Sequence, residues 1–286
     1  MRVDIDHLAQ WVGREELARD VVTAAPLAGL AATLDRDEPP PRPGDALPPL
    51  AHWLYFLPRH RQSELGPDGH AKRGGFLPPV PLPRRMWAGG RFEFRQPLRV
   101  GDEILRTSRI VDVRHRAGRS GDLVFVLVRH EVENATGIAL VEEHDIVYRD
   151  APQPGAPAPA ATHAPQVAAW SRPVVPDDVL LFRYSALTFN GHRIHYDRRY
   201  VTSVEGYPGL VVHGPLQATL LIDLVRRERP GAAIERFAFR AVRPLFDTGP
   251  FRVCGCPRTE RELDLWIEDA EGCVVMDATA TLAKNL

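Results

Sequence analysis

The feature of this 286-residue sequence that most constrains its fold is an internal repeat. Residues 90–113 and residues 235–258 both carry Arg-Phe-x-Phe-Arg from their second position, continue through Pro-Leu and an acidic turn with glycine, and lead into an alternating strand. Two more segments rich in Val, Ile and Phe follow each copy. They are separated by Asn-Ala-Thr-Gly in the first copy and Asp-Ala-Glu-Gly in the second, which favour hairpin turns. The sequence therefore predicts that the same run of antiparallel strands occurs twice in the chain.

A helix is expected ahead of the strands in each copy. Residues 25–37 carry leucines at i, i+3 and i+7, namely Leu27, Leu30 and Leu34. Residues 214–231 carry a longer apolar stripe, formed by Leu216, Leu220, Leu221, Leu224 and Val225. Pro215 suits the first helical position, and Pro-Gly at 230–231 ends the segment. A long helix followed by antiparallel strands is typical of an α+β unit, here present twice.

The two copies are separated by a segment rich in proline and alanine. Residues 151–165 are nearly uncharged and of low complexity, so we interpret them as a semi-extended linker. The expected domains are residues 1–150, the linker 151–165, and residues 166–286. The first 17 residues are acidic and are expected to be helical, unlike a signal peptide.

Composition excludes several classes of function. Apolar residues make up 44% and charged residues 26%, and the net charge is −1, so nothing indicates a nucleic-acid or membrane partner. Three cysteines do not form a disulfide framework, and the Cys254-Gly-Cys256 pair lacks further ligands for a metal. We expect a cytoplasmic protein in a reducing compartment.

Residues 189–197, Phe-Asn-Gly-His-Arg-Ile-His-Tyr-Asp, are the strongest candidate for chemistry. His195 is a candidate general acid or base, because imidazole titrates near neutrality. Asn190 can hold a water or a carbonyl but cannot accept a proton. Asp197 is expected to cap a short helix through residue 203. A metal site built from His192, His195 and Asp197, with His213, is the weaker alternative, and we expect no metal.

Gly214 offers a second candidate function. It follows Leu-Val-Val-His (210–213) and opens the most apolar predicted helix. A helix N-terminus presents unpaired N–H groups and partial positive charge, and a glycine allows a ligand carbonyl to approach the backbone. The interpretation is an oxyanion site. The alternative is that Gly214 only starts a helix packed tightly on a sheet.

Together these segments resemble a known family. Tyr-Ser-Ala-Leu-Thr-Phe-Asn-Gly-His-Arg-Ile-His-Tyr-Asp (184–197), followed by His-Gly-Pro at 213–215, is similar to the MaoC-like enoyl-thioester hydratases. That family has the hotdog fold, a long helix wrapped by an antiparallel sheet. The resemblance implies a double hotdog here, with His195 as the catalytic histidine, Gly214 as the oxyanion donor, and Asn190 where most relatives keep an aspartate.

The residues of the motif are most similar to those of the hydroxyacyl-thioester dehydratase type 2 branch, which includes mesaconyl-C4-CoA and itaconyl-CoA hydratases. The resemblance implies a hydro-lyase that adds or removes water across the double bond of an enoyl thioester, with citramalyl-CoA as one product. It implies no cofactor, because coenzyme A is part of the substrate. The first half lacks the motif and is expected to form one wall of the acyl tunnel. A homodimer or a higher homo-oligomer is left open.

Several basic side chains are candidates for binding the substrate. Arg193 and Arg183 lie nearest to the motif and could pair with the free carboxylate of a dicarboxylic acyl group. His213 and Pro215 are expected to line the same site. Cations flanking a Gly/Pro-rich segment of the first half could hold the phosphates of coenzyme A: Lys72, Arg73, Arg84 and Arg85.

Three alternatives remain open from the sequence. One is a 3-hydroxyacyl-thioester dehydratase acting on fatty acyl chains. Another is a thioesterase, although such sites generally need a carboxylate where this chain has Asn190. The last is a non-catalytic subunit that binds acyl thioesters without turnover.

Overall fold

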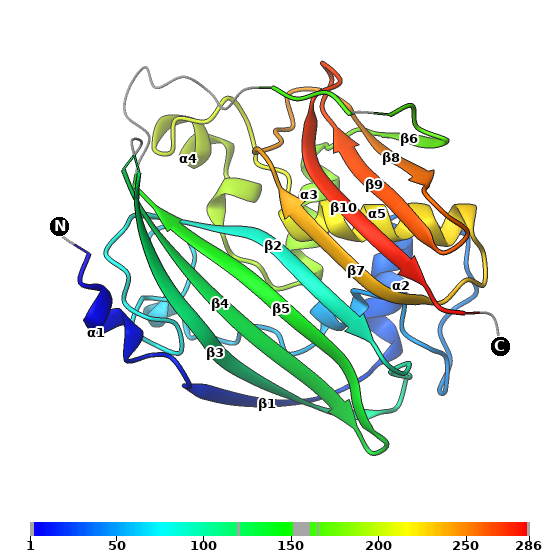
Figure 1. Ribbon diagram of the computed structural model, residues 1–286, viewed down its shortest axis with the longest axis horizontal. Coiled ribbons are helices and arrows are strands. Elements are labelled where there is room, and N and C mark those ends of the chain that lie inside the picture. Colours follow the sequence, from blue (N-terminus) through cyan, green and yellow to red (C-terminus); the bar gives the residue numbers. More distant parts are fainter. Residues whose placement is uncertain (1–2, 119–120, 151–160, 165, 285–286) are drawn as a thin grey trace.

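Ten antiparallel strands form a single sheet in the computed structural model, which describes residues 3–118, 121–150, 161–164 and 166–284 (Figure 1). The strand order is β1-β3-β4-β5-β2-β7-β10-β9-β8-β6. The strands are β1 (Glu15–Val21), β2 (Arg84–Phe94), β3 (Glu103–Gly118), β4 (Gly121–Asn134), β5 (Gly137–Arg149), β6 (Trp170–Val174), β7 (Ile234–Ala241), β8 (Phe251–Pro257), β9 (Glu262–Glu268) and β10 (Val274–Leu282).

The sheet has an approximate internal symmetry that follows the sequence repeat. From edge to centre the first half runs β1-β3-β4-β5-β2, and the second half runs β6-β8-β9-β10-β7. The repeated Arg-Phe-x-Phe segments lie on the two central strands and pair with each other, with Phe92 opposite Phe237. Each half is a hotdog unit, so the expected α+β double hotdog is confirmed. The two predicted hairpin turns also form, between β4 and β5 and between β9 and β10.

The helices lie mainly on one side of the sheet (Figure 1). They comprise five α-helices and three short 3₁₀ helices in the described residues. Their bounds are α1 (Ile5–Ala9), α2 (Ala24–Thr33), η1 (Ala51–Leu54), η2 (Gln62–Glu64), α3 (Asp178–Leu187), η3 (Arg193–His195), α4 (Arg198–Ser203) and α5 (Gly214–Glu228).

Helix α5 is the hydrophobic centre of the second unit. Every residue from Leu216 to Val225 is buried, and the helix packs against β8, β9 and β10. Pro215 lies in its first turn, where its missing N–H costs no hydrogen bond. Arginines in its last turn complement the negative end of the helix dipole. The helix ends at Glu228, three residues before the predicted end.

The first unit has a shorter helix and a buried pair of polar side chains beside it. Helix α2 spans ten residues, and only Leu27 and Leu30 within it are buried. The space that α5 fills in the second unit is shared here with η1, where His52 is 5% exposed and bonds to the buried carboxylate of Glu142 at 2.8 Å. The two units therefore differ in what covers the sheet.

The prediction of a helix over the first 17 residues was wrong in extent. Helix α1 covers only Ile5–Ala9, and Gly13 has a φ of +86°, which ends the helical path. Strand β1 follows and pairs with β3, so that Leu17 lies opposite Thr107. Pairing with a distant strand therefore overrides the local helical preference.

A buried carboxylate ties α2 to α5. Asp223 of α5 is 1% exposed and accepts hydrogen bonds from Arg36 at 2.6 Å, Arg227 at 2.7 Å and Arg172 at 3.3 Å. Arg227 and Arg172 also donate to the carbonyl of Leu34, which would otherwise be unpaired at the end of α2. This network joins both units at the C-terminal end of α5.

The predicted linker 151–165 falls largely outside the described residues, since residues 151–160 and 165 are not described. The placement of the domain boundary therefore stays a prediction. Among the described residues, none of the helices combines the length and apolar character needed to cross a lipid bilayer.

Candidate active site

The stretch 189–197 folds as tight turns between α3 and α4. The backbone N–H of Asn190 donates to the carbonyl of Ser185 at 2.8 Å, which turns the chain after α3. The side chain of Asp197 accepts from the N–H of Tyr200 at 2.9 Å and caps α4, as the sequence predicts. The histidines of the stretch are thereby held between two short helical segments.

His195 is buried and has one free ring nitrogen. Its Nδ1 lies 2.7 Å from the carbonyl oxygen of Val211, so Nδ1 carries the proton and Nε2 keeps its lone pair. Burial lowers the pKa of His195 to about 4, and the hydrogen bond to Val211 opposes this only in part. The imidazole is therefore neutral at physiological pH, the state that a general base requires.

The mouth of α5 lies beside His195. The ring of His213 stacks on the ring of His195 with 3.7 Å between centroids, and its Nε2 bonds to Ser185 Oγ at 2.8 Å. Gly214 follows directly and begins α5. A Cβ atom at Gly214 would meet nothing within 4 Å, so the space beside its Cα is open. Pro215, partly buried, comes next.

Asn190 does not point a free carbonyl oxygen at the site. Its Oδ1 accepts the backbone N–H of His192 at 3.0 Å. The ring of His192 lies edge-on to that of His195 at 5.4 Å. Burial, with the neighbouring imidazoles His70 and His195 adding to it, lowers the pKa of His192. One of the two lone pairs of the Asn190 side-chain oxygen is thus already in use.

The two arginines nominated for substrate binding differ in their surroundings. Arg193 forms an ion pair with Asp197 at 2.7 Å, donates to the carbonyl of Pro67 at 3.0 Å and covers the ring of Tyr200 at 4.1 Å. Arg183 is exposed on α3. A substrate carboxylate at Arg193 would have to displace an existing partner. Their roles in binding stay predictions.

The sequence did not identify Asp68 and His70 of the first unit as neighbours of the site. Asp68 and His70, in the loop after η2, lie against the 189–197 stretch, with the ring of His70 only 3.9 Å from that of His192. Asp68 Oδ2 and His70 Nδ1 are 2.9 Å apart. The tripeptide Asp-Gly-His at 68–70 is only a weak signal of a functional site. Nothing in the neighbouring sequence shows that this loop contacts residues about 120 positions later in the chain.

Asp68, His70 and His192 place donor atoms within 4.8 Å of one another and are the three residues in the described chain that could hold a metal ion together. This set differs from the one considered in the sequence. Both oxygens of Asp68 already accept hydrogen bonds from His70. If His70 bound a metal through Nε2, Asp68 would only support it, which leaves two imidazoles where a zinc site needs three protein ligands. We interpret the group as a hydrogen-bonded pair beside His192.

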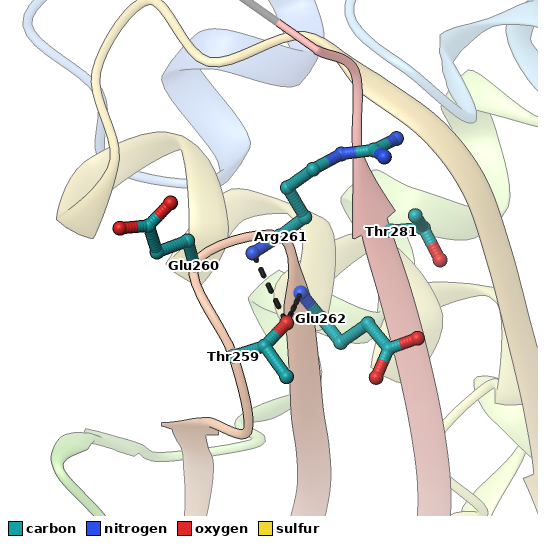
Figure 2. Close-up of a pocket in the computed structure, with 5 residues that line it drawn as sticks. All are labelled: Thr259, Glu260, Arg261, Glu262 and Thr281. Atoms are coloured by element: carbon teal, nitrogen blue, oxygen red, sulfur yellow. Dashed lines mark hydrogen bonds between the residues drawn. The ribbon is translucent and has the colours of Figure 1, made fainter.

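A hollow of about 440 Å³ elsewhere in the molecule does not match this chemistry. It is lined by Thr259, Glu260, Arg261, Glu262 and Thr281, around the turn before β9 (Figure 2). Thr259 Oγ1 accepts the backbone N–H groups of Glu262 and Arg261, so its role is to hold that turn. The lining is polar and contains no histidine or cysteine.

Comparison with known proteins agrees with the motif. The family model for hydroxyacyl-thioester dehydratase type 2 matches residues 50–247. A mesaconyl-C4-CoA hydratase of Chloroflexus aurantiacus is 48% identical over 277 residues, which cover 95% of this chain and 96% of that protein. A mitochondrial hydroxyacyl-thioester dehydratase type 2 of Schizosaccharomyces pombe is 26% identical, covering 87% and 91%.

Solved structures share the fold at low sequence identity. A MaoC-like dehydratase from Phytophthora capsici superposes with a TM-score of 0.71 at 14% identity, covering 99% of this chain and all of that one. HtdX of Mycobacterium tuberculosis has a TM-score of 0.65 at 15% identity, covering 94% and 100%. Another M. tuberculosis protein, described as a double hotdog, has a TM-score of 0.59 at 14% identity, covering 95% and 96%. With the family-model match and the 48% identity, these findings show that the chain belongs to the hydroxyacyl-thioester dehydratase type 2 family, a group of hydro-lyases of the hydratase and dehydratase type.

Proposed function

We propose that this enzyme hydrates an enoyl-CoA thioester that carries a second carboxylate, with mesaconyl-C4-CoA as the first candidate. The observation that carries the proposal is the neutral, buried His195, with its free Nε2, beside the open backbone of Gly214 at the mouth of α5. Identity to the Chloroflexus aurantiacus hydratase over nearly the whole chain supports the choice of substrate.

The chemistry follows from these groups. The thioester carbonyl accepts a hydrogen bond from the N–H of Gly214, which draws electrons from the β-carbon and stabilises the enolate as it forms. Water attacks the β-carbon as Nε2 of His195 takes one of its protons. The carbon–oxygen bond forms as the double bond opens, and the proton on His195 then passes to the α-carbon. The base returns to its neutral state, and the product is a 3-hydroxyacyl-CoA.

Arg85 of β2 is the cation that we propose for the second carboxylate. It is partly buried, lies opposite Tyr148 in the sheet, and has no ion pair among the described residues. The segments left undescribed contain no Asp or Glu. By contrast, Arg84 donates to Tyr207 Oη at 3.0 Å and lies 3.6 Å from Glu205. In mesaconyl-C4-CoA the free carboxylate is attached to the β-carbon, so its anchor must lie close to the attacked atom.

The placement of Arg85 near the histidines has an electrostatic consequence. Burial is the main cause that lowers the pKa of His70 and of His192, and the positive charge of Arg85 adds to it. Arg85 therefore lies within electrostatic range of His70 and His192. A planar guanidinium can hold a carboxylate through two parallel hydrogen bonds.

A steady-state assay against a small panel of enoyl-CoA thioesters tests the proposal. We expect mesaconyl-C4-CoA to lose its enoyl absorbance without release of free thiol, and to be preferred over crotonyl-CoA and over long-chain enoyl-CoAs. Release of thiol would instead indicate a thioesterase. Binding of acyl-CoA with no turnover of any member of the panel would indicate a non-catalytic subunit.

A further inference from the structure

A loop of the first unit is built into the candidate active site. Gly69 has a φ of +88°, and a Cβ atom there would lie 1.8 Å from the carbonyl oxygen of Gly191. Beside it, the backbone N–H of Arg193 donates to the carbonyl of Asp68 at 2.9 Å. The Arg193 side chain bonds to Pro67 as well. The loop thus touches the histidine stretch backbone to backbone, a contact that only glycine at 69 allows.

The side chains of this loop form a polarised Asp–His pair. Asp68 accepts from both the backbone N–H of His70, at 3.1 Å, and the ring Nδ1, at 2.9 Å. These contacts with His70 hold the pKa of Asp68 well below its usual range, against the effect of burial. Because the carboxylate can only accept, Nδ1 of His70 carries the proton and Nε2 keeps a lone pair. The same tautomer is fixed in His195 by Val211.

The imidazoles of the two units form a continuous row. The ring centroids are 3.9 Å apart between His70 and His192, 5.4 Å between His192 and His195, and 3.7 Å between His195 and His213. His213 uses Nε2 for its bond to Ser185. His70 and His195, separated in the row by His192, are the two whose Nδ1 is held by an oxygen acceptor and whose Nε2 keeps its lone pair.

The site needs a second acceptor to orient an attacking water. A water that gives one proton to His195 must have its other hydrogen held, or its lone pair is not directed at the β-carbon. The amide of Asn190 cannot accept a proton, and its Oδ1 already accepts the backbone N–H of His192. The first unit offers a further acceptor beside this stretch, the free Nε2 of His70.

We propose that Nε2 of His70, supported by Asp68, is this second acceptor, so that the active site is assembled from both hotdog units. The inference rests on the proposed hydratase function. His195 takes the proton of the water and returns it to the α-carbon. His70 accepts the hydrogen bond from the other O–H, which remains on the oxygen and becomes the hydroxyl of the product. No proton is lost or gained by His70 over the cycle.

Replacement of His70 tests the proposal. In His70→Ala we expect kcat to fall about 100-fold, within the range for a positioned acid/base group, while KM changes little. Added imidazole should restore part of the activity, because it can occupy the space left by the ring. His70→Gln keeps an acceptor oxygen and should retain more activity than His70→Ala. Asp68→Asn should also lower kcat, because the amide no longer fixes the tautomer.

The chain offers a matched control. His115 and Asp122 form a second Asp–His pair at 2.8 Å, between β3 and β4 and outside the histidine row. His115→Ala should leave kcat unchanged. Circular dichroism and thermal unfolding of each variant show whether a loss of rate reflects a loss of fold. If His70→Ala is unfolded, His70→Gln and His70→Asn replace it in the test. A folded His70→Gln variant that is less active than a folded His70→Asn variant would contradict the role of an acceptor at the ring position.

The possible outcomes separate the two proposals. Wild-type kcat in a folded His70→Ala, or a loss of rate that imidazole does not restore at all, overturns the role of His70 and leaves the hydratase function in place. Failure of the wild-type enzyme to hydrate any enoyl-CoA overturns the proposed function itself. A loss in His70→Ala that imidazole restores, with His115→Ala unaffected, supports the shared site.

Discussion

The two hotdog units share a strand order but differ in the helices that cover the sheet. In the second unit, α5 is buried from Leu216 to Val225, and Gln217, Thr219 and Asp223 are among its buried side chains. In the first unit, α2 buries only two leucines, and η1 also packs there, with its His52 bonded to Glu142 of β5. Repetition of a fold therefore does not require repetition of its core.

This difference teaches how one site can be divided between two units. In the second unit, the buried helix α5 begins at Gly214, and the carbonyl of Val211, in the segment before that helix, fixes the tautomer of His195. In the proposed site, the first unit adds polar groups on a loop and on β2, among them His70 and Arg85.

The largest effect is expected from removal of the base in the second unit. His195→Ala should lower kcat/KM for hydration by about 10²–10⁴-fold, because no other imidazole in the row combines a free Nε2 with a position beside the mouth of α5. Activity is measured as the loss of enoyl absorbance over time, with variant protein that is folded. Near-normal activity would show that another residue is the general base and would contradict its assignment to the second unit.

A truncation in each helix tests the difference between the cores. Leu221→Ala, at a fully buried position of α5, should lower the free energy of unfolding by about 2–5 kcal/mol. Leu27→Ala in α2, where the side chain is 7% exposed and its helix is short, should cost less. Urea denaturation of both variants provides the comparison. Equal losses would mean that the two helices are equally important to the fold.

Arg85 tests whether the first unit selects the substrate. Arg85→Met should lower kcat/KM for mesaconyl-C4-CoA by about 10–100-fold, the scale of a lost hydrogen bond between charged groups, and change that for crotonyl-CoA little. Arg95→Met, at an exposed arginine paired with Glu93 at 3.1 Å, is the control. An unchanged ratio between the two substrates would remove Arg85 from recognition.

The smallest effect concerns pH. The general base must be neutral, and burial lowers the pKa of His195 to about 4, so activity is lost only as the pH falls through that value. An ordinary imidazole, with a pKa of about 6.5, would already be mostly protonated at pH 6. We therefore expect kcat/KM at pH 6 to stay close to its value at pH 7. A several-fold decrease between these two values would indicate a base with an unshifted pKa.

The elements that the sequence predicted are those defined by local pattern. The repeat around Phe92 and Phe237, the apolar stripe of α5 and the cap at Asp197 each follow from spacing within a few turns or strands. The same local pattern placed His195 and Gly214 in one family motif. Their proximity in the structure, through the stack of His213 on His195, fits that placement.

The parts that the sequence did not predict depend on distant contacts. Strand β1 forms because it pairs with β3, although its own residues favour a helix. The loop containing Asp68 and His70 has its position set by a hydrogen bond to Arg193, far along the chain. Arg85 could be identified as a candidate cation from sequence, but its lack of an ion pair could not.

The most direct test of the central claim is a structure of the enzyme with a bound 3-hydroxyacyl-CoA product that carries a second carboxylate. We expect the thioester oxygen within hydrogen-bonding distance of the N–H of Gly214, and the hydroxyl oxygen between Nε2 of His195 and Nε2 of His70. A product whose hydroxyl contacts only residues of the second unit would contradict the shared site. A thioester held away from Gly214 would contradict the whole assignment.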